Sequence, residues 1–259
     1  MKSFSIYEQK FTGIFAALIL SFLLIFPGRL SSGTTETYEY RVDFLVVPSV
    51  DLTMKISPIT YGEKRAERLL FYTRTKKVFS TFFPVNNFYE SIYDPVDFSI
   101  QFGKKIIEQP NVKQEITAVY RNSRVEYSNG KSVSIPPKTH NFFSLLMHLR
   151  TLSADEIRTF RVPVEIEGKL FDATLKYIGE ERLSVGDRTL RTDRIEIILS
   201  EMVPGQAPVT KLTDVFYWKI GSAEGKRTVW LEKGGRRRIV RTEFFISPTW
   251  LTARLIDEE

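Results

Sequence analysis

Apolar and polar residues alternate along much of the chain that follows the N-terminal segment. Residues 37–46 (TYEYRVDFLV) place an aromatic or aliphatic residue at every second position and mostly polar residues between them. Residues 49–57 (SVDLTMKIS) repeat the pattern after a break at Pro48. A period of two over this length predicts half-buried strands of an antiparallel sheet, with one face toward a core.

Turn-forming dipeptides separate the apolar runs further along the chain. Asn129-Gly130, Gly168-Lys169, Gly186-Asp187 and Gly234-Gly235 stand between such runs, and Asn-Gly is a strong signal for a β-hairpin. Strands spaced in this way are typical of an antiparallel meander, sandwich or barrel. We expect a mainly β fold, with an antiparallel, strongly curved sheet that forms a half-barrel or open barrel. Residues 34–259 are expected to make one domain.

Residues 139–151 (THNFFSLLMHLRT) break the alternation and predict one amphipathic helix packed against the sheet. On a helical projection most of the apolar side chains form one face. The opposite, polar face is expected to consist of His140, Ser144, His148 and Thr151, with Asn141 beside it. Thr139 is the predicted N-cap, because the preceding Pro136-Pro137 would end a strand.

His140 and His148 are the only histidines of the chain. On one continuous helix their Cα atoms would lie about 12 Å apart, which is too far for one metal ion. Ser144 and His148 lie one turn apart and could pair as nucleophile and base, but no orienting acid or G-x-S-x-G motif accompanies them. The sequence therefore predicts solvated or capping histidines, with a Ser/His hydrolase as an alternative.

The N-terminal residues 1–33 have the layout of an export signal. Lys2 and Lys10 precede an uncharged apolar stretch from Phe11 to Gly28, and small residues follow up to Gly33. A cleaved signal peptide and an uncleaved membrane anchor both fit, since the stretch is just long enough to span a bilayer. Either places the remaining chain outside the cytoplasm, in the periplasm or cell envelope.

Composition narrows the chemistry further. The chain has no cysteine, which excludes disulfides, thiolate metal sites and cysteine nucleophiles. The net charge of +6 is spread along the chain, so a solvated surface is expected and no nucleic-acid partner. Phosphate-binding glycine motifs are absent from the sequence. No cofactor and no metal are expected.

Four segments stand out when taken in order, namely residues 82–95 (FFPVNNFYESIYDP), 140–152 (HNFFSLLMHLRTL), 168–197 and 227–246. Together they resemble a bacterial envelope family known as domain of unknown function 3108. The positions that match the pattern of the family are Glu90, Ser91, Asn141, Ser144, Leu149, Arg150, Trp230 and Leu231. The chain departs from that pattern after Leu231, where Glu232-Lys233-Gly234-Gly235 replaces an Asp-rich turn.

The resemblance implies a secreted β-rich protein with a helix against a curved sheet, similar in shape to the half-barrel carriers that move lipoproteins and lipids across the periplasm. It implies no activity and no catalytic residue. The candidate ligand or family-motif positions are Glu90, Ser91, Asn141, Ser144, His148, Arg150 and Trp230. Arg150 could meet an anionic head group or pair with carbonyls at the end of the helix.

These observations predict an exported, non-enzymatic binding or carrier protein for an apolar or lipid-like ligand. The abundant Phe side chains favour acyl chains or a lipidated partner. A structural or interaction factor of the cell envelope that binds another protein is the alternative. Membrane contact is expected through the N-terminal segment if that segment is not cleaved.

Overall fold

The computed structural model describes residues 33–44, 47–80, 84–110, 112–121, 123–210, 214, 221–223, 225–245 and 250–256. The chain divides into two compact units, residues 1–33 and 34–259. The export segment predicted at the N-terminus lies outside the described residues. The second unit carries the fold, and only this unit is considered below.

In the described residues, fourteen strands form a single sheet in the order β8-β7-β6-β5-β4-β3-β2-β1-β14-β13-β12-β11-β10-β9. The strands are β1 (Glu36–Phe44), β2 (Val47–Tyr61), β3 (Lys64–Thr75), β4 (Asn86–Tyr93), β5 (Ile100–Gln109), β6 (Val112–Arg121), β7 (Arg124–Tyr127), β8 (Ser132–Ser134), β9 (Arg161–Ile166), β10 (Lys169–Val185), β11 (Arg188–Glu201), β12 (Arg227–Glu232), β13 (Ile239–Phe245) and β14 (Trp250–Leu255). All ladders between these strands are antiparallel, as the alternation predicted.

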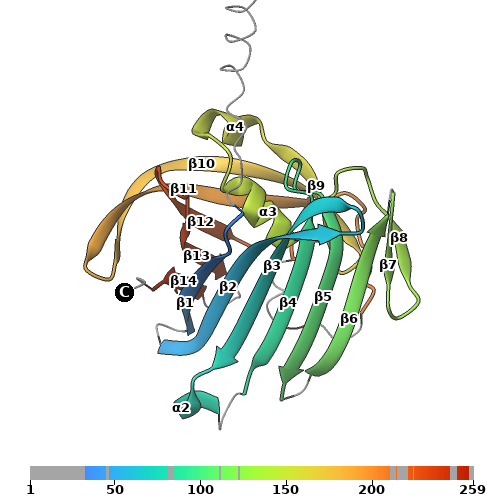
Figure 1. Cartoon of the computed structure of the whole chain (residues 1–259), viewed down its shortest axis with the longest axis horizontal. Helices are drawn as coiled ribbons and strands as arrows, with labels where there is room; N and C mark the ends of the chain where they lie inside the picture. Colours follow the sequence, from blue (N-terminus) through green and yellow to red (C-terminus); the bar gives the residue numbers. More distant parts are fainter. Residues whose placement is uncertain are drawn as a thin grey trace, which may run out of the picture. The chain divides into compact units, whose positions relative to one another are not determined.

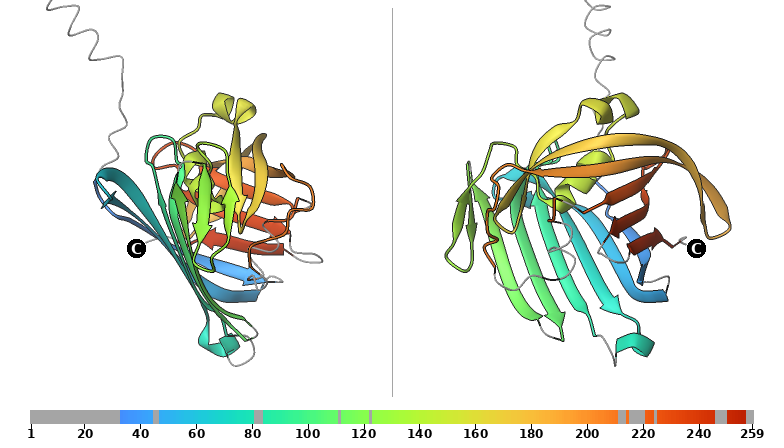
Figure 2. Two further views of the ribbon diagram at one scale, coloured as in Figure 1. Left: turned by 90° about the vertical axis from the view of Figure 1, so that its right-hand side faces the viewer. Right: turned by 180° about the vertical axis from the view of Figure 1, so that it is seen from behind.

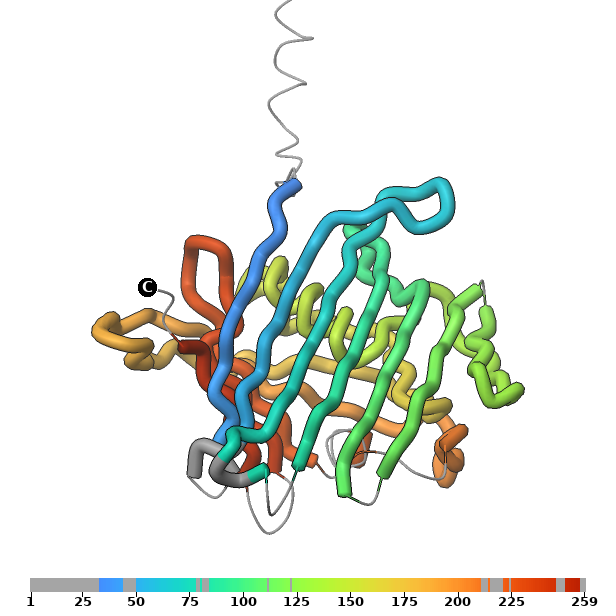
Figure 3. Tube along the Cα trace, turned by 60° about the horizontal axis from the view of Figure 1, so that its bottom comes forward, coloured from blue at the N-terminus to red at the C-terminus, as the bar shows by residue number. Residues whose placement is uncertain are grey.

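The sheet folds over itself without closing into a barrel. Strands β1 to β8 form one layer, and β9 to β14 cross it on the other side (Figures 1 and 2). The tube view in Figure 3 shows the helical segment around residues 140–160 behind the strands of the first layer. The predicted strongly curved, open antiparallel sheet is confirmed.

Three helices accompany the sheet in the described residues, namely α2 (Lys77–Ser80), α3 (Phe142–Leu149) and α4 (Ala154–Thr159). Helix α3 lies within the bounds predicted for the amphipathic helix but is shorter at both ends. Helix α4 was not predicted. It begins with a capping box in which Ser153 and Glu156 bond each other's backbone N–H groups.

A single large apolar cluster joins the two layers through α3. The inner faces of β1 to β5 and β9 to β14 contribute to it, together with six of the eight residues of α3. Phe143 of α3 contacts Phe71 on β3 and Tyr89 on β4, with ring centroids 4.7 and 5.4 Å apart. On the other side Phe142 contacts Phe244 on β13, at 5.8 Å. Helix α3 therefore fills the space between the layers.

The two edges of the open sheet are β8 and β9. The segment before α3 partly covers the free edge of β9. His140 N–H donates to Pro163 O at 2.9 Å, and Glu165 N–H donates to His140 O at 2.8 Å. Covering an edge in this way removes unpaired backbone groups from water. The same segment leads directly into α3, so edge and helix are physically linked.

Candidate functional site

The N-terminus of α3 gathers three of the predicted site residues. Asn141 is the N-cap, and its Oδ1 accepts from the Ser144 N–H at 2.8 Å, while the Ser144 Oγ accepts from the Asn141 N–H at 3.1 Å. The Asn141 Nδ2 donates to Ser91 Oγ on β4, at 2.8 Å. The helix is thus fixed to the first layer of the sheet by a buried polar chain.

This geometry corrects the predicted N-cap. Thr139 does not cap the helix, and its hydroxyl donates instead to Pro136 O at 2.6 Å. Asn141 and Ser144 were expected on a polar face, yet both are buried, with Ser144 fully enclosed at 0% exposure. The physical reason is that the two layers of the sheet enclose the helix from both sides.

The Ser144 hydroxyl is engaged by backbone groups of Asn141. Among the described residues no hydrogen bond joins Ser144 to His148, and His148 Nδ1 bonds His140 instead. The structure therefore offers no nucleophile–base pair at these positions.

His140 and His148 form a directly bonded pair, contrary to the sequence prediction. His140 Nε2 lies 2.9 Å from His148 Nδ1, and the ring planes are 7° from parallel. The prediction was wrong because His140 is extended and bridged to β9, so the helical rise per residue does not apply to it. His140 is 1% exposed, and His148 is half-buried.

Aromatic rings surround the histidine pair. Phe98 stacks on His148 with centroids 4.5 Å apart, and Phe160 meets the same ring edge-on at 4.9 Å. Burial and, to a smaller extent, the charge of His148 lower the pKa of His140 to about 4, against the hydrogen bond to the Lys138 carbonyl. Burial likewise lowers the pKa of His148. Both rings are therefore neutral near pH 7.

Arg150 ties the other end of α3 to the sheet. Its Nη2 donates to Glu36 Oε2 on β1 at 2.8 Å and to Tyr38 Oη at 3.2 Å, and Nε donates to Arg237 O at 3.3 Å. The guanidinium meets Glu36 and the β12–β13 turn and not the carbonyls at the end of α3; contact with an anionic head group stays a prediction. Burial alone would raise the pKa of Glu36, but the hydrogen bond and the charge of Arg150 hold this pKa below its usual value.

A second polar cluster joins the two layers near the open edges, and we call it the seam. It consists of Lys105 on β5, Tyr120 on β6, Tyr127 on β7, and Glu165 and Glu167 at the end of β9. The Glu165 carboxylate accepts from the Tyr120 and Tyr127 hydroxyls and from the Gly168 N–H. Lys105 Nζ pairs with Glu167, whose other oxygen accepts from Thr210 Oγ1 at 2.9 Å.

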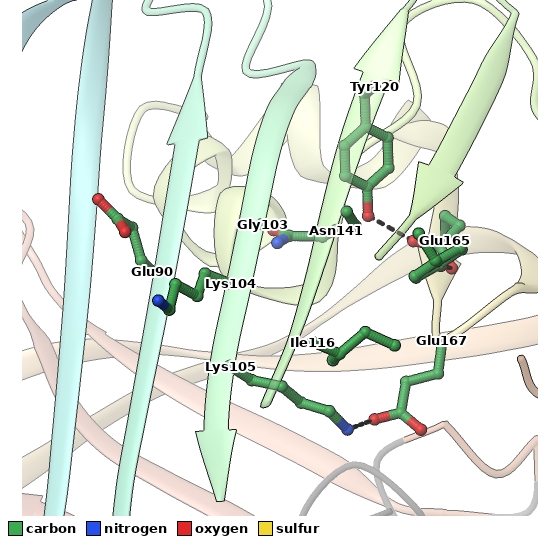
Figure 4. A pocket seen from close by; sticks show the side chains of 11 residues that line it. Glu90, Gly103, Lys104, Lys105, Ile116, Tyr120, Asn141, Glu165 and Glu167 are labelled. Carbon is green, nitrogen blue, oxygen red and sulfur yellow. Dashed lines mark hydrogen bonds and ion pairs between the residues drawn. The ribbon is translucent and has the colours of Figure 1, made fainter. Parts of the chain in front are cut away.

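Figure 4 shows the seam around a small cavity of about 50 Å³. The cavity is lined by Glu90, Gly103, Lys104, Lys105, Ile116, Ala118, Tyr120, Tyr127, Asn141, Glu165 and Glu167. Two predicted site residues, Glu90 and Asn141, thus line this cavity. Ser91 and Ser144 do not line it but are hydrogen-bonded to Asn141. The cavity is large enough for water but not for an organic ligand.

Burial dominates the electrostatics of the seam. It raises the pKa of Glu165, against the hydrogen bonds from Tyr120, Tyr127 and Gly168. It lowers the pKa of Lys105 to about 8, against the charges of Asp214 and Glu165. Asp214 Oδ2 lies 3.9 Å from Lys105 Nζ. Lys105 therefore offsets part of the negative charge that the fold buries here.

Backbone strain gathers at these same contacts. The described non-glycine residues with positive φ are Phe98, Lys138, Glu167 and Arg237, with φ between 49° and 59°. The first two contact the histidine pair, Glu167 contacts Lys105, and Arg237 contacts Arg150. A non-glycine residue keeps such a conformation only where the contacts around it hold the backbone in place.

Trp230 lies apart from the other predicted residues. It is buried on the face of β12 opposite Val229 and Leu231, which belong to the apolar cluster. Its ring lies between Arg194 and Arg241 of the neighbouring strands, at 5.2 and 4.8 Å, and its Nε1 donates to Glu181 at 2.7 Å. Trp230 therefore packs the outer face of the sheet and does not line the seam cavity.

No group of three or more potential metal-ligating side chains occurs among the residues that the structure describes. Within the same ranges, no helix combines the length and hydropathy that crossing a bilayer requires.

Residues 39–248 match the family described as "Protein of unknown function (DUF3108)". The chain belongs to this family. The resemblance seen in its motifs is thereby confirmed. A "Beta-barrel-like Protein of Domain of Unknown Function DUF1849 from Brucella abortus" is a similar solved structure, with 10% identity, a TM-score of 0.49, and coverage of 86% of this chain and 95% of that one. No curated protein matches the chain.

Proposed function

We propose that this member of the family is an exported, non-enzymatic binding protein of the cell envelope that holds an apolar, lipid-like group between the two layers of its sheet. The observation that carries the proposal is the position of α3. Seven of its eight residues are buried, and it stands between two apolar sheet faces. A helix that is apolar on nearly every side and fills such a space can be exchanged for an acyl chain at little cost in buried area.

The volumes support a closed, ligand-free form. The cavity at the N-cap of α3 measures about 50 Å³, and a second cavity between β5, β6 and residues 135–139 measures about 170 Å³, whereas sites for lipid-sized ligands need roughly 300–1,000 Å³. Movement of α3 would supply the missing volume and would expose the rings of Phe71 and Tyr89, which Phe143 of the helix now covers. In the proposed cycle, α3 leaves the interior as the ligand enters.

The polar ties of α3 suit such a movement. Apart from apolar packing, its first turn is bonded to Ser91 through Asn141, and its last turn to Glu36 through Arg150. The tie to Ser91 is one hydrogen bond, and Arg150 makes several, to Glu36, Tyr38 and the carbonyls of the β12–β13 turn; such bonds contribute about 1–3 kcal/mol each. The ties can therefore position the helix without preventing its release.

The test uses protein purified from cells that express the whole sequence, with a photoactivatable fatty acid as the probe. After illumination, peptide mass spectrometry locates the label. We expect label on the interior residues Phe71 and Tyr89, and competition by unlabelled fatty acid. Label confined to the outer face around Trp230, or spread without competition, would contradict the proposal.

Glu36→Gln supplies a graded version of the test, because it weakens the tie to Arg150. The matched control is Glu201→Gln, which weakens an ion pair of similar exposure and length, Lys169–Glu201 at 2.7 Å against 2.8 Å. Interior labelling should increase several-fold in Glu36→Gln and stay unchanged in Glu201→Gln. An equal response of both variants would indicate general loosening of the fold instead.

A further inference from the structure

The histidine pair stands at a junction of three elements. His140 bonds the edge strand β9 through its backbone, His148 lies on α3, and Phe160 links the pair to the end of α4. The imidazole–imidazole bond is thus a side-chain connection between α3 and the segment that covers the edge of the sheet. The proposed function does not use it, and the pair has no role in capping.

The hydrogen-bond network fixes the protonation of the pair. His140 Nδ1 lies 3.0 Å from the Lys138 carbonyl, which can only accept, so Nδ1 carries the proton and Nε2 is the acceptor. His148 therefore donates from Nδ1 to His140 Nε2. A further proton on His140 Nε2 would remove the acceptor and place an imidazolium at a residue that is only 1% exposed.

Two neighbouring elements bring charged groups toward the pair. Asp97 comes from the loop before β5 and pairs loosely with Lys138, at 3.9 Å. Glu156 comes from α4, whereas the Glu165 carboxylate of β9 points into the seam. Asp97 and Glu156 act on His148 through charge alone, and neither carboxylate is hydrogen-bonded to a ring. The protonated pair consequently has little compensation for the loss of water.

We propose that the His140–His148 pair is a pH-sensitive latch that holds α3 against the covered edge of the sheet and releases it when the pair is protonated. This inference rests on the proposed function, since it assigns the regulation of the same interior. The left-handed conformations of Phe98 and Lys138, which flank the pair, show that the surrounding loops are held out of their preferred geometry to enclose it.

The latch is tested by hydrogen exchange on the purified full-length product, with rates corrected for intrinsic pH dependence. His140 alone, with a pKa of about 4 in the closed form and an ordinary pKa of about 6.5 in the released form, predicts that protection of residues 142–149 falls at least about twentyfold between pH 7 and pH 5. Protection of β2 and β3 should remain constant and serves as the internal control. Constant protection of α3 over this range would overturn the proposal.

Two variants separate the latch from other titrations. The double variant His140→Phe/His148→Phe removes donor and acceptor together, which can be nearly neutral for stability, and should abolish the pH response. His148→Gln is the second variant if the first does not fold. Glu165→Gln should retain the response, because the seam carboxyl is not part of the latch. A response that survives loss of the histidines, or is lost in Glu165→Gln, would overturn the proposal.

The outcomes also separate the latch from the binding function. Release of α3 at pH 5 without interior labelling by the photoactivatable fatty acid would support the latch and contradict the binding function. Interior labelling together with equal protection of α3 at both pH values would support the binding function and contradict the latch.

Discussion

Removal of the two tyrosine hydroxyls that bond Glu165 tests how the seam holds the open sheet together. Tyr120 and Tyr127 both donate to this carboxylate, which is 2% exposed. A hydrogen bond to a charged group contributes about 1.5–3 kcal/mol. The double variant Tyr120→Phe/Tyr127→Phe should therefore lose about 3–5 kcal/mol of unfolding free energy at pH 8.

The loss of unfolding free energy in the double variant should depend on pH, because protonation of Glu165 makes the loss smaller. Burial already raises the pKa of Glu165, so the folded state binds the proton more tightly than the unfolded state and loses stability as pH rises through the folded-state pKa. Without the tyrosine donors that pKa rises further. At pH 5 the double variant should therefore lose only about 1–2 kcal/mol, since a protonated carboxyl costs less to bury.

Urea unfolding followed by tryptophan fluorescence at pH 5, 6.5 and 8 measures these losses. Glu165→Gln is the matched background, because an amide of nearly the same shape cannot ionise. In that background the tyrosine substitutions should cost about 1–2 kcal/mol at every pH. A loss that is independent of pH with Glu165 present, or equally large in the Glu165→Gln background, would refute the account of the seam.

Three further predictions address the seam, the helix cap and the histidines. Gly168→Ala should cost about 2–5 kcal/mol in urea unfolding, because φ is +88° and the new Cβ would lie 2.4 Å from Val209 Cγ1. Gly130→Ala, at φ +81° with open space around it, should cost only about 1 kcal/mol, and equal losses would contradict the packing argument. Asn141→Ala should cost about 2–4 kcal/mol, from the lost cap and the buried Ser91 hydroxyl left without its donor. A loss below about 1 kcal/mol would show that this polar chain does not fix α3. Between pH 7 and pH 4 the wild-type chain should lose about 3 kcal/mol of unfolding free energy because of His140. The pKa of His140 is lowered to about 4 in the folded chain, whereas the unfolded chain already binds this proton below pH 6.5. An unfolding free energy that does not change with pH relative to the double histidine variant would contradict this.

The strands were predictable because their periodicity records which side of the sheet each residue faces. Tyr38 and Tyr40 are buried on the core face of β1, as the alternation in residues 37–46 requires. The hairpin at Asn129-Gly130 also forms, with Gly130 at φ +81°. Local chemistry alone decides both features, so one sequence suffices to find them.

The start of α3 was misplaced because two residues could cap it. Thr139 and Asn141 are both good N-caps, and the prolines before Thr139 favoured the earlier start. The partner of Asn141 is Ser144, whereas the usual capping-box signature has Glu or Gln at that position. Helix α4 does carry the usual signature, with Ser153 and Glu156 three residues apart, and could have been found from it.

The seam and the histidine pair could not be read from the sequence. Periodicity tells which face a residue occupies but not how a sheet folds over itself. Lys105 and Glu167 are 62 positions apart, and Tyr120 and Glu165 are 45 positions apart. Val164 of β9 enters the apolar core, so alternation places the next residue, Glu165, on the opposite face of the strand. Glu165 is buried there because Tyr120 and Tyr127 of the other layer pack against it.

The central claim is that α3 occupies the place of the ligand, and a removable lock on α3 tests it most directly. Because the chain has no cysteine, Glu36→Cys/Arg150→Cys introduces two unique thiols in place of the natural tie. A short bismaleimide with a cleavable disulfide can join them, and a reductant then releases the helix in the same molecules. The control is the same cross-link at Lys169→Cys/Glu201→Cys.

The readout is interior labelling by the photoactivatable fatty acid before and after cleavage. The account predicts at least a tenfold lower yield of interior label, about 1.4 kcal/mol or more, while the lock is closed, with recovery on cleavage and no change in the control. Equal interior labelling in the locked and released forms would show that the ligand space does not depend on α3 and would contradict the account.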